Sequence, residues 1–207
     1  REVCGAEQSA RTKSNLTKQN VRGRIIKSLG GFYYVADSEQ KGNIIECRAR
    51  GAFRQQNVKP CVGDWAQVEL TPQGKGYVVE IEERKNSLVR PPLANLDQLV
   101  LVVSIADPAP NAFVLDKLIA IAEYQEIEPI IVITKCDLAD PEEFAQIYRK
   151  AGFTVLETKS LQHEGIESVM EILKDKTSAF CGNSGAGKST LLNAIDPRIT
   201  SFLAASK

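Results

Sequence analysis

The hydrophobic pattern of the chain changes at about residue 90. Before it, from Arg22 to about Arg84, short stretches of alternating apolar and polar residues are separated by turns containing Gly and Pro, which is typical of short strands. We predict strands over residues 24–29, 32–36, 43–50, 64–70 and 77–82. Gly30 and Gly31 between the first two strands predict a hairpin turn or a bulge.

Beyond residue 95, continuous apolar runs alternate with stretches of helical spacing. Strands are predicted over residues 98–104, 129–134, 153–156 and 178–181, and helices over 113–126, 141–151, 166–173 and 189–195. Asp140 is a good N-cap for the second of these helices, with Pro141 at its first position. This alternation predicts a mainly parallel α/β sheet with right-handed crossovers.

The two patterns predict an all-β domain followed by an α/β domain. Five short strands in about 65 residues predict a five-stranded barrel of the oligonucleotide-binding (OB) type over residues 21–90, although a small sandwich or an SH3-like barrel has the same pattern. The α/β domain is expected over residues 91–207, and the prolines of Arg90–Asn95 indicate an extended linker. Residues 1–20 lack periodicity and are expected to form a flexible leader.

The composition is that of an ordinary globular protein. The 207 residues are 43% hydrophobic and 25% charged, which suits one or two domains. No apolar run approaches the roughly 20 residues of a membrane helix, and the start of the chain contains no signal-peptide core. We therefore expect a cytoplasmic protein with no membrane partner.

The five cysteines are scattered and form no Cys-x-x-Cys pair, and His163 is the single histidine. A disulfide framework or a self-contained zinc site is therefore not expected. Four of the cysteines are predicted to be buried as small apolar residues: Cys47, Cys61, Cys136 and Cys181.

Charge is unevenly distributed although the formal net charge is zero. Residues 1–60 carry 12 Lys and Arg against 5 Asp and Glu, whereas residues 61–207 carry 14 against 21. A basic half suggests a polyanion as its partner, and a solvated basic surface is the alternative.

One segment matches G-x-x-x-x-G-K-[ST] at every fixed position, between a predicted strand and a predicted helix: Gly182-Asn183-Ser184-Gly185-Ala186-Gly187-Lys188-Ser189. Glycines let the backbone curl so that successive N–H groups point at phosphate oxygens, and the helix N-terminus adds positive potential. Lys188 is expected at the β- and γ-phosphates, the Ser189 hydroxyl as a Mg²⁺ ligand, and Thr190 as a further nucleotide-binding residue. The segment predicts a nucleotide phosphate site, and a chance Gly-rich turn is the alternative.

Candidate residues for reading a base lie upstream of this segment. Thr134-Lys135-Cys136-Asp137 matches [NT]-K-x-D directly after a predicted buried strand. The Asp137 carboxylate can accept two hydrogen bonds from guanine N1–H and the 2-amino group, and the Lys135 stem can lie over the base. Thr134 stands where Asn is commoner, so its hydroxyl would have to brace the phosphate loop. A solvated pair of loop charges is the alternative.

A third loop, Thr158-Lys159-Ser160, follows the strand predicted over residues 153–156 and is expected to offer a backbone N–H to guanine O6. Only 18 residues follow Ser189, so the sheet that a phosphate loop needs must come from upstream. The resulting order of base-reading loop, O6 loop and phosphate loop indicates a GTPase domain that is circularly permuted between its third and fourth motifs.

With this motif order, the chain resembles the circularly permuted ribosome small-subunit-dependent GTPases over roughly residues 22–200. The resemblance is carried by Gly23-Arg24-Ile25-Ile26, Gly31-Phe32-Tyr33-Tyr34-Val35, Val62-Gly63-Asp64, and Arg90-Pro91-Pro92 followed by Ala94-Asn95-Leu96-Asp97-Gln98. It implies an OB barrel that contacts the RNA of the small ribosomal subunit. It also implies a domain that binds GTP and GDP with Mg²⁺, hydrolyses GTP when the small subunit stimulates it, and controls ribosome binding during late subunit assembly.

In that family the chain continues past the phosphate loop into a switch segment, a D-x-x-G element and a Cys/His zinc module. None of these follows Ser189 here, so we expect an incomplete GTPase domain, either a truncated chain or a gene fragment, with zinc only in the missing module. No catalytic residue stands out, turnover by this chain stays open, and a monomer is expected. A non-cycling RNA-binding fragment and an ATP-using P-loop phosphotransferase are the alternatives.

Basic and aromatic residues occur together in the predicted barrel. The candidate RNA contacts are Arg24, Lys27, Arg48, Arg50 and Arg54, among aromatic residues that include Phe32, Tyr33, Tyr34 and Trp65. Cations contact phosphates, and aromatic rings stack on bases. Each ring can instead fill the barrel, and one of Tyr33 and Tyr34 must face outward if they share a strand.

Overall fold

The computed structural model describes residues 20–50 and 59–198. The expected leader over residues 1–19 and the candidate RNA contact Arg54 lie outside these ranges. None of the helices within them is long and apolar enough to span a lipid bilayer.

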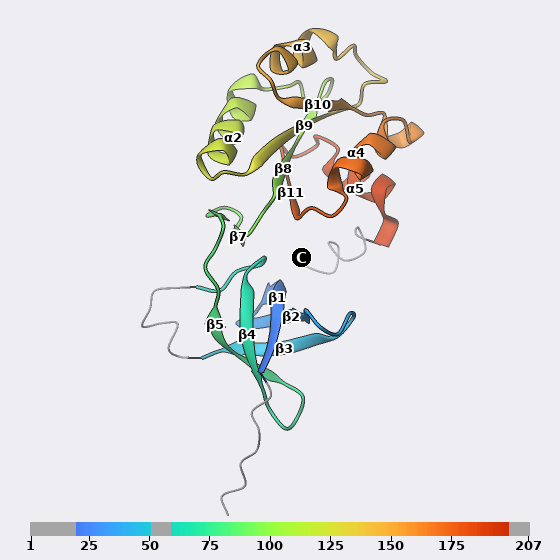
Figure 1. The fold of residues 1–207 in the computed structure, drawn as a ribbon. Helices are drawn as coiled ribbons and strands as arrows, with labels where there is room; N and C mark the ends of the chain where they lie inside the picture. The colour runs from blue at the N-terminus through green and yellow to red at the C-terminus, as the bar shows by residue number, and fades with distance from the viewer. Residues whose placement is uncertain (1–19, 51–58, 199–207) are drawn as a thin grey trace, which may run out of the picture. The chain divides into compact units, whose positions relative to one another are not determined.

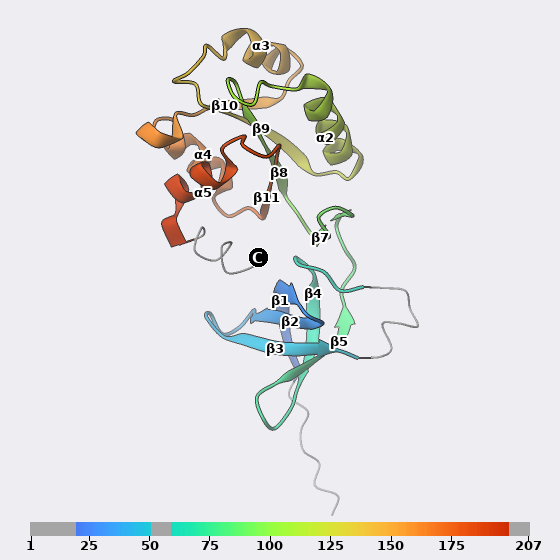
Figure 2. The same cartoon turned by 180° about the vertical axis from the view of Figure 1, so that it is seen from behind.

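The chain divides into two compact units (Figures 1 and 2). The first contains the described residues up to Pro60 together with Trp65–Glu82, and the second contains Cys61–Asp64 and the described residues from Glu83 onward. The units therefore divide between Glu82 and Glu83, earlier than the position near residue 90 where the hydrophobic pattern changes.

The first unit is a closed barrel of five strands in the order β1-β2-β3-β5-β4. Its strands are β1 (Asn20–Leu29), β2 (Phe32–Asp37), β3 (Ile44–Ala49), β4 (Trp65–Leu70) and β5 (Gly76–Ile81). All neighbouring strands are antiparallel except β3 and β5, which pair in parallel. Because the sheet closes through the β1–β4 pair, the predicted five-stranded barrel is confirmed and the sandwich is excluded.

Side chains alternate between the barrel interior and its outer face, as the two-residue period of a strand requires. On β2, Tyr33 and Val35 are buried, whereas Tyr34 lies on the outer face. Burial also raises the pKa of the Cys47 thiol to about 12. This thiol is therefore protonated at neutral pH and acts as the small apolar core residue that the sequence predicted.

The second unit contains a four-stranded sheet in the order β10-β9-β8-β11, in which all neighbouring pairs are parallel. Its strands are β8 (Gln98–Ser104), β9 (Glu128–Thr134), β10 (Thr154–Glu157) and β11 (Ser178–Cys181). The helices are α2 (Ala112–Tyr124), α3 (Glu142–Lys150), α4 (Ile166–Leu173) and α5 (Lys188–Ile195), with a short 3₁₀ helix η1 (Ser160–Gln162). The predicted parallel α/β sheet is confirmed.

Helices cover both faces of this sheet (Figure 1). One buried cluster joins α2 and α3 to the sheet and includes Leu101, Leu115, Ile119, Ile131 and Tyr148. The other joins α4 and α5 to the opposite face and includes Val100, Val132, Ile166, Val169 and Leu191. Because β8 and β9 are buried on both faces, their sequences are continuous apolar runs rather than alternating ones.

Helix α3 begins one residue later than predicted. Pro141, expected at the first helical position, is its N-cap residue, and the helix starts at Glu142. The Asp140 carboxylate still accepts a hydrogen bond from the Glu142 backbone N–H at 3.0 Å. Asp140 therefore caps the helix from one residue further out.

The prediction of an extended linker over Arg90–Asn95 is wrong, because this segment is part of a hairpin. Strand β6 (Ser87–Leu88) pairs antiparallel with β7 (Leu93–Ala94), and the turn between them contains a cis Arg90–Pro91 peptide bond. The Ala94 carbonyl oxygen lies 2.0 Å from the point where a Cβ on Gly63 would stand. Only glycine fits at position 63, and this contact between distant segments has no local sequence signal.

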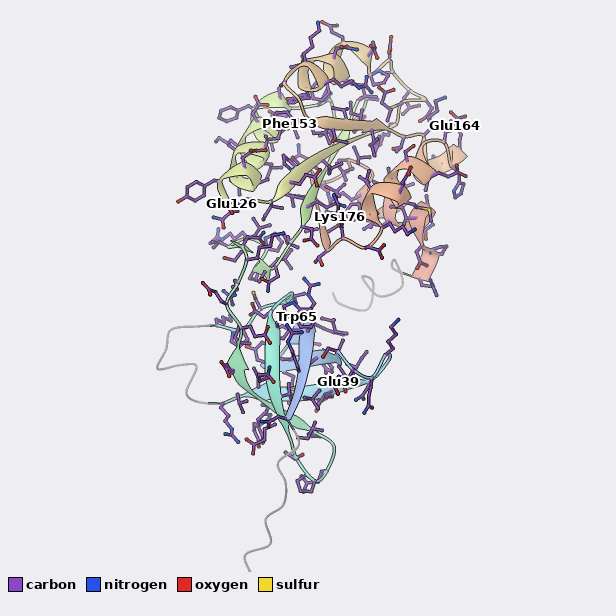
Figure 3. All side chains as sticks on the ribbon, viewed as in Figure 1. Glu39, Trp65, Glu126, Phe153, Glu164 and Lys176 are labelled. Atoms are coloured by element: carbon purple, nitrogen blue, oxygen red, sulfur yellow. The ribbon has the colours of Figure 1, made fainter. Side chains whose placement is uncertain are left out.

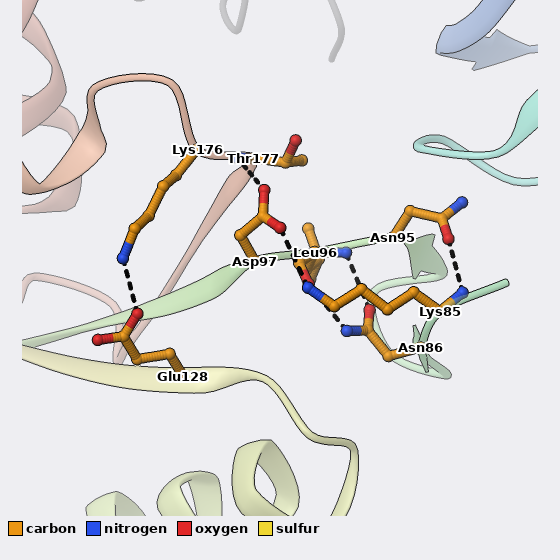
Figure 4. Close-up of polar contacts among 8 residues, drawn as sticks. All are labelled: Lys85, Asn86, Asn95, Leu96, Asp97, Glu128, Lys176 and Thr177. Carbon is orange, nitrogen blue, oxygen red and sulfur yellow. Dashed lines mark hydrogen bonds and ion pairs between the residues drawn. The ribbon is translucent and has the colours of Figure 1, made fainter.

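Polar contacts hold the hairpin to the start of the sheet (Figure 4). The Asn86 side chain accepts a hydrogen bond from the Leu96 N–H at 2.9 Å and donates one to the Leu96 carbonyl at 2.8 Å. The Asp97 carboxylate accepts from the Thr177 N–H at 2.7 Å, just before β11. Backbone groups that the short strands leave unpaired are thereby satisfied.

An ion pair between a buried carboxylate and a partly buried guanidinium joins the two segments that make up this part of the second unit. Asp64 is fully buried and accepts hydrogen bonds from Nε and Nη2 of Arg84, at 2.7 and 2.9 Å, and from the Cys61 N–H at 2.8 Å. The bond to Asp64 raises the pKa of Arg84. A carboxylate without water is tolerated here because these donors replace its hydration.

Replacing Arg84 tests this buried pair. Arg84→Met leaves the Asp64 carboxylate buried without its cation, so we expect the free energy of unfolding to fall by about 3–5 kcal/mol. Lys85→Met removes the same charge from the exposed Lys85–Asp97 pair and should cost less than about 1 kcal/mol. Urea unfolding followed by circular dichroism compares the two variants, and equal small losses would contradict the prediction.

Candidate functional site

The phosphate loop follows β11 and passes directly into α5. At Gly182, a Cβ would stand 2.2 Å from the Val102 carbonyl oxygen of the neighbouring strand β8, so no other residue fits there. The β8–β11 pairing therefore fixes where the loop begins. Asn183, Ser184 and Gly185 are exposed, which leaves this side of the loop open to a ligand.

Lys188 and Ser189 stand at the two positions where the motif needs its cation and its hydroxyl. The Lys188 ammonium donates hydrogen bonds to the carbonyls of Gly182 and Asn183, both at 2.7 Å, so it lies against the loop that precedes it. Ser189 and Thr190 are exposed in the first turn of α5. The site thus combines a positive side chain with the positive end of a helix.

The base-reading loop is attached to the phosphate loop by two side chains. The Thr134 hydroxyl, buried at the end of β9, donates a hydrogen bond to the Ala186 carbonyl at 2.7 Å. This is the bond that the replacement of Asn by Thr requires. The Lys135 ammonium donates to the Gly185 carbonyl at 3.0 Å. Residues about 50 positions apart in the sequence therefore form one site.

Lys135 has a second bond that the sequence did not indicate, to the Asp107 carbonyl in the loop between β8 and α2. The next residue of that loop, Pro108, lies against Gly185, since its Cδ is 3.3 Å from the point where a Cβ on Gly185 would stand. Asp107-Pro108-Ala109-Pro110, between a buried strand and a helix, was the available signal for a rigid loop. The loop thus forms one wall beside the phosphate loop.

The third loop lies beside the base-reading loop. The Thr158 N–H donates to the Ile133 carbonyl at 2.8 Å, and the Cys136 N–H donates to the Thr158 carbonyl at 3.3 Å. Asp137 is exposed next to these contacts. The three loops predicted from separate motifs therefore lie at the carboxyl ends of β9, β10 and β11, the edge where parallel sheets bind ligands.

Lys159 has a contact that bears on its expected role. Its backbone N–H donates to the Glu164 carbonyl at 3.0 Å, and its ammonium lies 2.6 Å from the Glu164 carboxylate. The ammonium–carboxylate hydrogen bond raises the pKa of Lys159. Hydrogen bonding of this N–H to guanine O6 would therefore require the 159–164 loop to release it, whereas Ser160 is held beside Thr158 by a hydroxyl–hydroxyl contact of 3.5 Å.

Within the described residues, no group of three or more His, Cys, Asp or Glu side chains is placed to hold a metal ion. The hydroxyl of Ser189 is the side-chain oxygen that the phosphate-loop motif offers to Mg²⁺, with phosphate oxygens and water completing such a site. Ser189 is exposed at the start of α5, where a metal bound to phosphates could reach it.

On the outer face of the barrel, several cations lie close to aromatic rings. The Arg48 guanidinium lies 4.6 Å from the Phe32 ring centroid, and the Lys27 ammonium lies 5.6 Å from that of Tyr34. Arg24 lies 5.7 Å from the ring of Trp65, which is labelled in Figure 3. Aromatic rings beside cations suit a single-stranded nucleic acid, whose bases stack on rings and whose phosphates contact cations.

The fourth described candidate, Arg50, is more strongly engaged within the protein. Its guanidinium forms an ion pair with Glu69 and lies 5.9 Å from the Tyr77 ring centroid. Tyr77 is 42% exposed on β5 and was not among the aromatic residues selected from the sequence. Its position in an alternating strand next to a Gly-rich turn was the available signal.

Fold and site together define a class of protein, a circularly permuted P-loop GTPase domain preceded by an OB barrel. Two family models match the chain, the RsgA N-terminal domain over residues 22–78 and the RsgA GTPase over residues 81–205. The chain belongs to the RsgA family.

Relatives and solved structures agree with this assignment. The chain is 46% identical to the small ribosomal subunit biogenesis GTPase RsgA of Caldanaerobacter subterraneus subsp. tengcongensis, covering 87% of this chain and 61% of the relative, and 42% identical to that of Bacillus subtilis, covering 86% and 62%. The crystal structure of YjeQ from Thermotoga maritima has a TM-score of 0.77 at 36% identity, covering 86% of this chain and 66% of that one.

The crystal structure of YloQ, described as a circularly permuted GTPase, has a TM-score of 0.74 at 38% identity, covering 93% of this chain and 68% of that one. The predicted permutation is thereby confirmed. The chain spans about three fifths of the length of the curated relatives it matches.

The Thr134 hydroxyl can be removed without changing the size of its side chain. Thr134→Val deprives the Ala186 carbonyl of its donor, so we expect GDP to bind roughly 2- to 10-fold more weakly, the effect of one hydrogen bond. Thr134→Ser keeps the donor and should retain the affinity of the parent chain. Titration with fluorescent GDP measures both, and a loss of affinity in Thr134→Ser but not in Thr134→Val would show that the methyl group, not the hydroxyl, matters.

Proposed function

We propose that this chain binds guanine nucleotides through the three loops of its second unit and RNA of the small ribosomal subunit through its barrel. The observation that carries the first part is the attachment of the base-reading loop to the phosphate loop, through Thr134 to Ala186 and Lys135 to Gly185. Because these hydrogen bonds hold the two loops side by side, one nucleotide can contact the first loop with its base and the second with its phosphates.

Each loop supplies a different part of the nucleotide site. Successive N–H groups of Gly182–Gly187 cradle the phosphates, with the Lys188 ammonium turned from its loop carbonyls toward the β- and γ-phosphates. The Ser189 hydroxyl ligates Mg²⁺, which would neutralise phosphate charge. Asp137 accepts the N1–H and 2-amino hydrogens of guanine, the Lys135 stem covers the base, and the loop Thr158–Ser160 faces O6.

The full activity proposed is GTP hydrolysis that controls binding to the small ribosomal subunit during its late assembly. It is supported by the curated relatives, which are named small ribosomal subunit biogenesis GTPases. Their additional length is where segments that respond to the γ-phosphate would lie. Nucleotide binding and RNA binding are therefore the parts of this function that the 207 residues are proposed to carry.

The choice of base provides a direct test of the nucleotide site. In a fluorescent-GDP titration with Mg²⁺, unlabelled GDP should displace the probe and ADP should not. Asp137→Asn exchanges an acceptor for a donor, so GDP affinity should fall by roughly 5- to 100-fold and xanthosine diphosphate should bind better than GDP.

Asp140→Asn is the matched control, because it removes a carboxylate three residues away and Asn still caps α3. It should leave base preference unchanged. Equal competition by ADP would assign the site to an ATP-using phosphotransferase and contradict the role of Asp137.

RNA binding by the barrel is tested through its dependence on salt. Replacing Arg24 and Arg48 with Gln removes two phosphate contacts, so single-stranded RNA should bind more weakly and the slope of log K against log salt should become less steep by about 1.4. The control pair Lys150→Gln and Lys174→Gln removes two exposed cations from the second unit and should leave the slope unchanged. Unchanged binding in both double variants would contradict RNA binding by this face.

A further inference from the structure

A pocket of about 240 Å³ opens on the barrel beside the turn between β4 and β5. Its walls come from β2, β3, β5 and that turn, and the side chains used below are Phe32, Glu46, Arg48, Lys75 and Tyr77. All of them belong to the first unit. The volume is below the roughly 300–1,000 Å³ of pockets for drug-sized ligands, so it suits one small group.

The strand register aligns two aromatic side chains and an arginine across this pocket. Arg48 on β3 is the Cα partner of Phe32 on β2 and also of Tyr77 on β5. Residues that are directly opposite in a sheet point to the same face, so the three side chains form one row on the outside of the barrel. A planar guanidinium already covers the Phe32 ring, with its Cζ 4.6 Å from the ring centroid.

The pocket also contains a carboxylate that can change partners. Glu46 lies two residues before Arg48 on the same face of β3, and its carboxylate pairs with the Lys75 ammonium at 3.1 Å. The side chains are 37% and 69% exposed, and an ion pair this exposed contributes little stability. Lys75 can therefore move to a phosphate while Glu46 accepts hydrogen bonds from a ligand.

We propose that this pocket binds one unstacked nucleobase of single-stranded RNA, and that Glu46 selects guanine. The base stacks between Phe32 and Tyr77, displacing the Arg48 guanidinium from the ring face toward the flanking phosphate. Glu46 accepts the N1–H and 2-amino hydrogens of guanine, whereas uracil offers a single N–H between two carbonyl oxygens that a carboxylate repels. This inference rests on the RNA-binding role proposed for the barrel.

Trp65 is less suited than Phe32 to take a base, although Lys27 and Arg50 also lie near rings, those of Tyr34 and Tyr77. Arg22 lies 4.2 Å from the Trp65 ring centroid and is also held by Glu82 through two hydrogen bonds, at 2.7 and 2.8 Å. Displacing Arg22 would break both bonds. The Arg48 guanidinium covers its ring next to an open pocket, so stacking is expected at Phe32 and Tyr77.

The test compares two fluorescein-labelled oligoribonucleotides, UUUUUUUUU and UUUUGUUUU, by fluorescence anisotropy with the complete 207-residue chain. Saturating GDP and Mg²⁺ are present so that the nucleotide site does not capture the guanine. We expect the guanine-containing RNA to bind about tenfold more tightly, which is within the range for a bidentate contact to a base. Glu46→Gln should abolish this preference while the affinity for UUUUUUUUU stays the same or improves.

Glu80→Gln is the matched control, because it removes the same charge from an exposed position on β5 outside the pocket. It should keep the preference for guanine. Tyr77→Ala should weaken binding of both RNAs by about tenfold through lost stacking, and thermal unfolding of each variant checks that the barrel remains folded.

The outcomes separate this inference from the proposed function. Measurable but equal binding of the two RNAs would overturn the guanine pocket and leave RNA binding by the barrel in place. A preference that survives Glu46→Gln would overturn the role of Glu46. Binding of neither RNA would overturn RNA binding by the barrel and the pocket with it.

Discussion

Strands β8 and β11 come from distant parts of the chain and pair so closely that the Val102 carbonyl occupies the space of a side chain at position 182. The proposed nucleotide site depends on this contact, because it fixes where the phosphate loop leaves the sheet. From there the Ala186 and Gly185 carbonyls meet Thr134 and Lys135 at the end of β9. Because β8, β9, β10 and β11 are all parallel, their carboxyl ends share one edge, and the chain order of the loops has no effect on the assembled site.

The loop between β8 and α2 adds contacts to the site beyond those of the three predicted motifs. Its Asp107 carbonyl shares the Lys135 ammonium with the phosphate loop, and Pro108 lies against Gly185. A lysine whose ammonium is held by two backbone carbonyls keeps its stem in place, which is what covering a base requires. In contrast, the carbonyls of Gly182 and Asn183 in its own loop accept the hydrogen bonds of Lys188, so exchanging these carbonyls for phosphate oxygens leaves the connection between the loops intact.

In the barrel, the two-residue period of the strands places the core side chains on one face and the candidate binding side chains on the other. On β3, Cys47 points inward with its pKa raised by burial, and its neighbours Glu46 and Arg48 lie on the outer face. The interior is apolar, and the ionic groups lie on the outer face. Substitutions on the outer face can therefore alter a ligand contact with little change in the free energy of unfolding. The same alternation explains why aromatic residues of the barrel divide into core residues such as Tyr33 and surface residues such as Tyr34 and Tyr77.

The sequence by itself determined the two fold classes, the phosphate loop and the permuted order of motifs, because these depend on local period and fixed spacing. It also indicated that the Thr134 hydroxyl must take the place of an Asn amide, because the residue at this position of the motif braces the phosphate loop. Tertiary structure alone decided the close approach of Gly63 to Ala94 in the hairpin, the burial of Asp64 beside Arg84 and the row of Phe32, Arg48 and Tyr77. Each of these is a contact between segments distant in the sequence. The residues on one side of such a contact do not indicate which residues lie on the other side.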